Sequence, residues 1–141
     1  MAKSVLNVVF IWFIGSLLPI KLTGQNAINL NGKWIPIRQE MGGKVLPMGN
    51  FKNQSLIIKD STYTFSAESI DKGVVTYNDG KMDIFGKEGV NSGKHFRAIY
   101  KINNELLTVC YNLAGNWYPE EYDTSKSPVL FISIFRKEQT E

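Results

Sequence analysis

The chain is predicted to form about eight short strands, each ended by a turn signal, and no stretch shows helical periodicity. The best-defined strand, residues 95–102, places apolar side chains at alternate positions. Asp79-Gly80 and Asn103-Asn104 are tight-turn signals between neighbouring strands. This spacing predicts an all-β fold, an antiparallel barrel or sandwich. The expected strands cover residues 34–40, 55–59, 63–67, 73–77, 81–85, 95–102, 106–112 and 129–137.

Residues 1–24 have the layout of a secretory signal peptide. Lys3 gives a positive start, residues 5–20 are almost wholly apolar, and Thr23-Gly24 offers small residues for cleavage. The alternative is an uncleaved membrane anchor, but the apolar run of about 16 residues is shorter than the ~20 that span a bilayer. We therefore expect a secreted or periplasmic protein with one barrel domain, residues 25–141, and no membrane span after cleavage.

Signal cleavage would leave a chain that is almost neutral. The full sequence has 16 basic and 13 acidic residues, and removal of Lys3 and Lys21 would leave 14 and 13. No basic stripe remains of the kind that binds nucleic acid, so we expect no nucleic-acid partner. Cys110 is the only cysteine, which excludes an intramolecular disulfide. We interpret it as a buried small apolar side chain, with a reactive thiol as the alternative.

The last expected strand, residues 129–137, favours a barrel over a sandwich. Ile132, Ile134 and Arg136 share one face by period two, and an arginine on an inward face needs a partner. In a closed barrel the last strand pairs with the first, which brings Arg136 near Trp34. A guanidinium over an indole stabilises by about 0.5–2 kcal/mol. We therefore predict Gly32, Trp34 and Arg136 as the residues that close the barrel; the alternative is that Arg136 extends into solvent.

The Gly-x-Trp sequence at residues 32–34 and the arginine near the end resemble the lipocalin and wider calycin pattern. Residues 30–138 are more closely similar to small bacterial lipocalin-like domains of unknown function, which occur in exported and multidomain proteins. The resemblance implies a barrel far more firmly than an activity. Where those domains usually have an arginine and a phenylalanine in the late loop, this chain has Tyr118 and Tyr122. The matching pieces, in order, are LNGKW (30–34), AIYKI (98–102), LLTVCY (106–111), YPEEY (118–122) and FRK (135–137).

The sequence contains no motif for catalysis, for a metal or for a cofactor. A phosphate-binding glycine loop, a nucleophile elbow, a zinc-binding helix and paired cysteines are all absent from it. His95, the only histidine, is interpreted as a surface residue at a strand edge. Glu120 and Glu121 are interpreted as a solvated loop, because adjacent residues in an extended loop point apart. We expect no enzyme, metal or cofactor; catalysis would require a carboxylate or histidine buried beside a cleft.

The aromatic residues are the features that suggest binding. An eight-stranded barrel is just wide enough to be filled by side chains or to hold one small ligand, and tyrosine hydroxyls would orient that ligand. We predict an exported lipocalin-like domain that binds a small, partly apolar ligand, with residues 41–50 and 116–118 at the rim. The alternative is a filled barrel that acts as a non-enzymatic module for a protein or envelope partner. The predicted ligand-binding residues are Tyr63, Phe65, Tyr77, Phe96, Tyr100, Trp117, Tyr118 and Tyr122.

Overall fold

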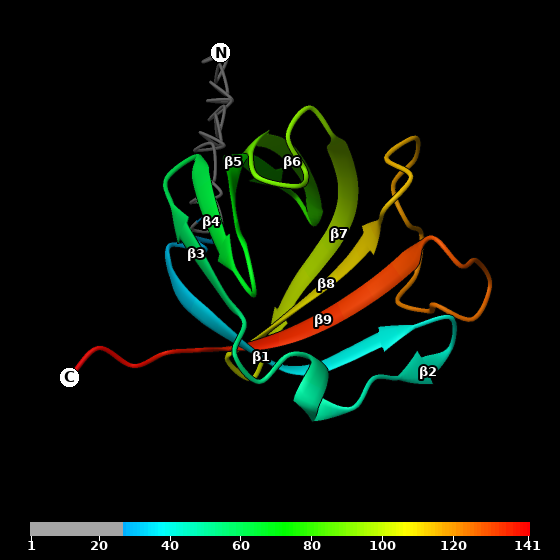
Figure 1. The fold of residues 1–141 in the computed structure, drawn as a ribbon, viewed down its shortest axis with the longest axis horizontal. Helices are drawn as coiled ribbons and strands as arrows, with labels where there is room; N and C mark the ends of the chain where they lie inside the picture. The colour runs from blue at the N-terminus through cyan, green and yellow to red at the C-terminus, as the bar shows by residue number, and fades with distance from the viewer. Residues whose placement is uncertain (1–26) are drawn as a thin grey trace, which may run out of the picture.

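The computed structural model describes residues 27–141, which form a closed barrel of eight antiparallel strands (Figure 1). The strands follow chain order around the barrel, β9 pairs with β1 to close it, and the short β2 extends β1 as a hairpin. The predicted signal peptide lies outside the described residues. The elements are β1 Gly32–Met41, β2 Lys44–Val45, the 3-10 helix η1 Met48–Asn50, β3 Ser55–Lys59, β4 Thr62–Ser66, β5 Ile70–Asn78, β6 Lys81–Glu88, β7 His95–Asn103, β8 Leu106–Asn112 and β9 Leu130–Lys137.

The predicted all-β fold and the closure of the barrel are confirmed. Strands β3 and β8 begin and end at the predicted residues, whereas β5 and β6 extend further than predicted. Asp79 and Gly80 have φ of 50° and 78°, as a tight hairpin turn between antiparallel strands requires. The next hairpin turns at Asn104-Glu105, one residue later than predicted. Within residues 27–141, no helix has both the length and the apolar character needed to cross a membrane.

Buried side chains around Trp34 close one end of the barrel. Trp34 is almost fully buried, and its indole N–H donates to the carbonyl oxygen of Leu30 at 2.8 Å. The backbone N–H of Leu30 donates to the Tyr77 hydroxyl at 3.0 Å. Tyr77 in turn packs edge to face against Tyr100, with 5.8 Å between the ring centroids. These side chains fill the end at which β1 begins, so space for a ligand has to lie toward the other end.

The cation over the Trp34 ring is Lys137, and the prediction of Arg136 for this position was wrong. The Lys137 Nζ lies 5.6 Å from the ring centroid, whereas Arg136 is exposed and pairs with Ile35 in the ladder between β1 and β9. Gly32 belongs to the same arrangement: its φ is 135°, and a Cβ there would lie 2.5 Å from Cε of Lys137. The absence of a side chain at position 32 therefore makes room for the lysine stem beside the indole.

The error arose because both faces of β9 are apolar. The face predicted to point inward instead packs on the outside of the barrel, under the long loop of residues 113–129. Period two identifies two faces of a strand but does not say which one is inside when both are covered. The inward residues are Phe131, Ser133 and Phe135, and the outward residues are Leu130, Ile132, Ile134 and Arg136.

Cys110 lies in this outer apolar cluster. It is fully buried, beside Leu130 and Ile132 and under Tyr122 of the long loop. Burial, with a smaller contribution from the charge of Asp123, raises the pKa of the Cys110 thiol to about 11. The interpretation of this residue as a buried apolar side chain is confirmed.

Candidate functional site

The interior of the barrel contains a cavity of about 280 Å³. None of the four residues at the closed end, Leu30, Trp34, Tyr77 and Tyr100, borders it. The volume is close to the lower limit of about 300 Å³ for pockets that hold small molecules. Most of the wall is aliphatic or aromatic, from Leu56, Ile58, Phe65, Val75, Met82, Ile84, Phe96, Leu113, Phe131 and Phe135.

The cavity persists because some inward positions carry small side chains. On β9 the inward residues are Phe131, Ser133 and Phe135, so a serine lies between two large rings. On β5, the inward residue that borders the cavity is Val75, which is smaller than the rings of Phe65 and Phe96 in the same wall. Alternation of large and small residues on inward positions is a usual way for a small barrel to leave interior space.

One polar group in the wall is formed by three side chains from β1, β9 and the segment before β3. The Gln39 amide donates to Oε1 of Gln54 at 2.8 Å and to the Ser133 hydroxyl at 3.4 Å. Gln39 and Ser133 are 4% and 1% exposed. These bonds satisfy the buried amide of Gln39 and fix its position at the cavity wall.

A second polar group joins β5 to the loop between β6 and β7. Asp71 is 5% exposed; its Oδ1 accepts from the Asn91 backbone N–H at 3.1 Å, and its Oδ2 accepts from the Asn91 side-chain amide at 3.2 Å. Gly89 has φ of 92°, and a Cβ there would lie 2.4 Å from the Asp71 carboxylate. Only glycine fits this close approach, so the loop is held against the carboxylate at the cavity wall.

Two tyrosine hydroxyls complete the polar lining. Tyr63 and Tyr111 both border the cavity. Burial first, and the negative charge of Asp71 second, raise the pKa of Tyr63. Burial, with a smaller effect of Tyr63, raises the pKa of Tyr111. Both phenols are therefore protonated at neutral pH, and a phenol hydroxyl can donate to a ligand or accept from it.

Asp71 is the kind of buried carboxylate beside a cavity that catalysis would require. Acid–base or nucleophilic catalysis, however, generally needs a second positioned group. Among the described residues that line the cavity there is no other carboxylate and no histidine, cysteine or lysine. Nor does the part of the chain from 27 to 141 contain a group of three metal-ligating side chains. What the lining offers is one charge, two phenols, three amides and a hydroxyl, which can orient a bound molecule.

Three of the predicted ligand-binding residues, Tyr63, Phe65 and Phe96, line the cavity. Tyr77 and Tyr100 point inward but pack at the closed end, away from the cavity. Tyr111 also lines the cavity and was not predicted, although it follows Leu107 and Val109 at alternate positions of β8. The polar lining was not predicted either, because polar residues at inward positions follow no apolar pattern; it consists of Asp71, Asn91, Gln39, Gln54 and Ser133.

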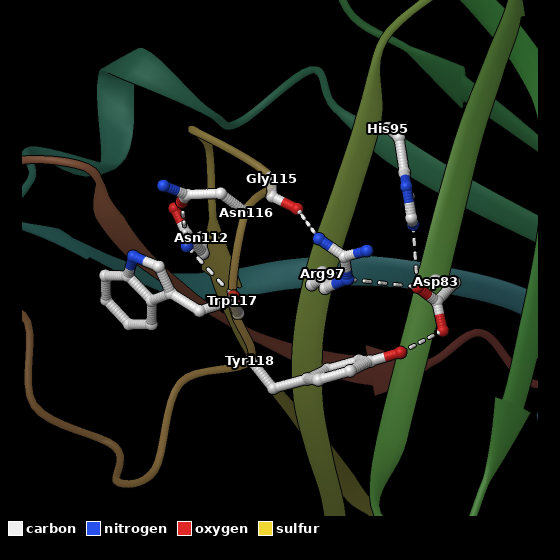
Figure 2. A network of polar contacts seen from close by, with 8 residues as sticks. All are labelled: Asp83, His95, Arg97, Asn112, Gly115, Asn116, Trp117 and Tyr118. Atoms are coloured by element: carbon white, nitrogen blue, oxygen red, sulfur yellow. Dashed lines mark hydrogen bonds and ion pairs between the residues drawn. The ribbon is translucent and has the colours of Figure 1, made fainter.

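Tyr118 lies outside the barrel, in a polar network on β6 and β7. Figure 2 shows Asp83 at the centre of this network. Its Oδ1 is 2.7 Å from Nε2 of His95 and 4.0 Å from Nε of Arg97, and its Oδ2 accepts from the Tyr118 hydroxyl at 2.5 Å. Partial burial would raise the pKa of Asp83, but the hydrogen bonds from Tyr118 and His95 and the charges of His95 and Arg97 hold it below its usual value.

The same network anchors the start of the long loop. Arg97 also donates to the carbonyl oxygen of Gly115 (Figure 2). The side-chain amide of Asn112, which is fully buried, donates to the Trp117 carbonyl oxygen at 2.9 Å and to Oδ1 of Asn116 at 3.2 Å. These bonds turn residues 113–118 back along the outside of the wall.

The predicted rim was therefore wrong. Neither residues 41–50 nor residues 116–118 border the cavity, and Tyr122 packs in the outer cluster. Trp117 is 41% exposed and also lies apart from the cavity. Local hydrogen bonds at Asn112 and Arg97 decide the direction of this loop, and they are not visible in the pattern of aromatic residues. The polar side chains that do border the cavity from loops are Gln54 and Asn91.

Comparisons with known proteins add no assignment: neither protein-family models, nor curated proteins, nor solved structures provide a match to this chain. The closed eight-stranded antiparallel barrel is compatible with a calycin-like fold.

Proposed function

We propose that the protein is an exported, lipocalin-like barrel that carries a small, partly apolar molecule in its interior cavity. The observation that supports this best is the cavity itself: about 280 Å³, with a largely apolar wall and a few convergent polar groups. Pockets of this kind are the usual sites of small-molecule binding. Export is supported by the signal-like sequence of residues 1–24, and a lipocalin-like relationship by the strand order and the Gly32-x-Trp34 sequence.

The competing proposal is a non-enzymatic module that binds a protein or an envelope component through exposed aromatic side chains. That proposal expected a barrel filled by its own side chains. The cavity argues against it, although Trp117 is 41% exposed on the outer loop. We therefore favour the carrier, and the experiments below separate the two proposals.

The first experiment tests whether the exported protein contains a bound small molecule when it is purified. The full-length gene is expressed in its natural host, the exported product is purified, and its native mass spectrum is compared with its denatured one. We expect an excess mass that disappears on denaturation, and this mass gives the composition of the carried molecule. A bare chain favours the interaction module over the carrier, because a tight carrier should not copurify empty.

The second experiment measures binding of a small neutral probe, 2-phenylethanol, by titration calorimetry. Leu113→Trp and Val75→Phe each replace an aliphatic side chain at the cavity wall with a larger, aromatic one. Both substitutions should weaken binding of the probe at least tenfold. Ile57→Trp is the matched control, because Ile57 is about as exposed as Leu113 (40% and 39%) but does not border the cavity. A bare protein that binds no probe, or binding that both cavity variants leave unchanged, contradicts the carrier proposal.

A further inference from the structure

We propose that the cavity selects ligands that carry a positively charged amine, and that the amine binds to Asp71. This inference rests on the proposed carrier function and adds the chemical class of the ligand.

Asp71 places an isolated charge at the cavity wall. Among the described residues that line the cavity it is the only formally charged one, and it is 95% buried. The ion pairs of residues 27–141 all lie elsewhere, on the surface of the barrel or at its edges. A buried carboxylate in an apolar wall is unfavourable unless a positive charge or sufficient hydrogen bonds compensate it. A ligand ammonium group would supply the missing charge.

The Asp71 carboxylate can accept more hydrogen bonds than Asn91 donates to it. An ionised carboxylate has about four acceptor sites. Asn91 occupies one on each oxygen, through its backbone N–H and its side-chain amide. The other sites remain for a ligand, and an ammonium group, with its three N–H donors, is suited to them. Asn91 thus orients the carboxylate without neutralising it.

The surroundings of the Asp71 carboxylate suit a cation with an apolar body. Tyr63 lies close enough to Asp71 for the carboxylate to affect the ionisation of its phenol, and Phe65 pairs with Asp71 across the ladder between β4 and β5. Aromatic faces attract cations, and the Tyr63 hydroxyl can accept from an ammonium N–H. The rest of the wall, including Ile58 and Met82, suits an apolar body. An anionic ligand would be repelled by Asp71, and the part of the lining that comes from residues 27–141 has no positive side chain to attract it.

The alternative is that Asp71 serves only to hold the loop between β6 and β7. Two variants separate the roles. Asp71→Asn removes the charge and retains the shape and one oxygen acceptor for Asn91. Asn91→Ala removes a loop contact and leaves the charge in place.

The experiment is titration calorimetry on the full-length protein at pH 7 with three probes of similar shape: 2-phenylethylamine, 2-phenylethanol and 3-phenylpropionate. We expect the amine to bind at least about tenfold more tightly than the alcohol, and the acid to bind more weakly than the alcohol. A charge-assisted hydrogen bond is strong enough for such a ratio. Asp71→Asn should reduce the affinity for the amine about tenfold and change that for the alcohol less than threefold. Asn91→Ala should preserve the preference for the amine.

The results distinguish failure of this inference from failure of the carrier proposal. If the wild-type protein binds the alcohol as tightly as the amine, the role of Asp71 in selection is refuted and the carrier remains. If no probe binds, the carrier proposal fails and this inference fails with it. The ratio of amine to alcohol in the wild-type protein decides the question even if Asp71→Asn does not fold.

Discussion

Gly73 lies directly opposite Tyr63 on the ladder between β4 and β5, and its missing side chain makes room for the Tyr63 ring. A Cβ at position 73 would lie 2.8 Å from Cε1 of Tyr63 and 2.0 Å from the carbonyl oxygen of Phe85. The ladder to β6 shifts register beside this position: Lys72 pairs with Glu88 and Gly73 with Gly86, so the extra residue, Lys87, lies on β6. This close approach places the Tyr63 hydroxyl beside the cavity.

We predict that Gly73→Ala lowers the free energy of unfolding by about 2–3 kcal/mol, because the added methyl group forces backbone or ring to move. Urea denaturation measures the change. Gly49→Ala is the control: a Cβ there meets nothing within 4 Å, and the expected change is within about 0.5 kcal/mol. Equal effects of the two substitutions would contradict the packing described for Gly73.

The network around Asp83 predicts a stability that depends on pH. Asp83→Asn should lower the free energy of unfolding at pH 7 by about 1–3 kcal/mol, since bonds to an ionised group are lost. The pKa of Asp83 is held below the 3.8 of a free aspartate. The stabilisation by the ionised Asp83 carboxylate is therefore complete above about pH 4, and it is lost as the pH falls through the folded-state pKa. Urea denaturation at several pH values measures it.

Tyr118→Phe provides an independent check of this network. This substitution should lower the free energy of unfolding in the same pH range, and it should speed amide hydrogen exchange in residues 113–118. Glu120→Gln, which changes an exposed carboxylate nearby, should have little effect on either measurement. If Asp83→Asn lowers the free energy of unfolding equally at every pH, the ionisation of Asp83 is not the source of its contribution to stability.

The two basic residues at the end of β9 should differ in their contribution to stability. Lys137→Met keeps an apolar stem beside Gly32 but removes the ammonium group from the Trp34 ring. It should lower the free energy of unfolding by about 0.5–1 kcal/mol. Arg136→Met removes an exposed cation that lies over no ring and should change the stability less. Thermal unfolding of the two variants at low and moderate salt measures the difference. A larger loss of stability for Arg136→Met than for Lys137→Met would support the contact between Arg136 and Trp34 that the sequence predicted.

Cys110 should be almost inert in the native protein. Burial raises its pKa from 9.0 to about 11, so at pH 8 the thiolate fraction is lower by roughly a hundredfold than in the unfolded chain. The reaction of Ellman's reagent with the native protein should be slower than that with the urea-denatured protein by at least this factor. Comparable rates in the two states would mean that the outer cluster opens readily.

The fold could be predicted from sequence because the strands and turns carry strong local patterns. Phe96, Ala98 and Tyr100 alternate along β7, and Asp79-Gly80 adopts the turn that its residue types favour. The alternation of apolar residues did not identify the inward face where a strand is covered on both faces, as β9 is. It also failed at β5, where Asp71, Gly73 and Val75 share the inward face, because an aspartate and a glycine do not show the apolar alternation that marks an inward face.

The site was only partly predictable, because contacts between distant residues decide it. Tyr118 bonds to Asp83, which is 35 residues away in the sequence, and this bond takes the tyrosine out of the predicted rim. Asp71 and Asn91 are 20 residues apart and meet only because Gly89 allows the loop to approach. A count of aromatic residues could find Tyr63, Phe65 and Phe96, which follow a strand face, but not the polar groups that come from loops.

The pairing of β1 with β9 has a consequence for the way this chain reaches its structure. Trp34 pairs with Lys137 and Met41 with Phe131, so the ladder joins segments roughly a hundred residues apart, and contacts of such separation form slowly. Until residues 130–137 have been synthesised, β1 and β8 each present an unpaired edge, which invites association with other chains. Closure is therefore a single late event, and a nascent or truncated chain without its last strand is exposed to aggregation in a way that the finished barrel is not.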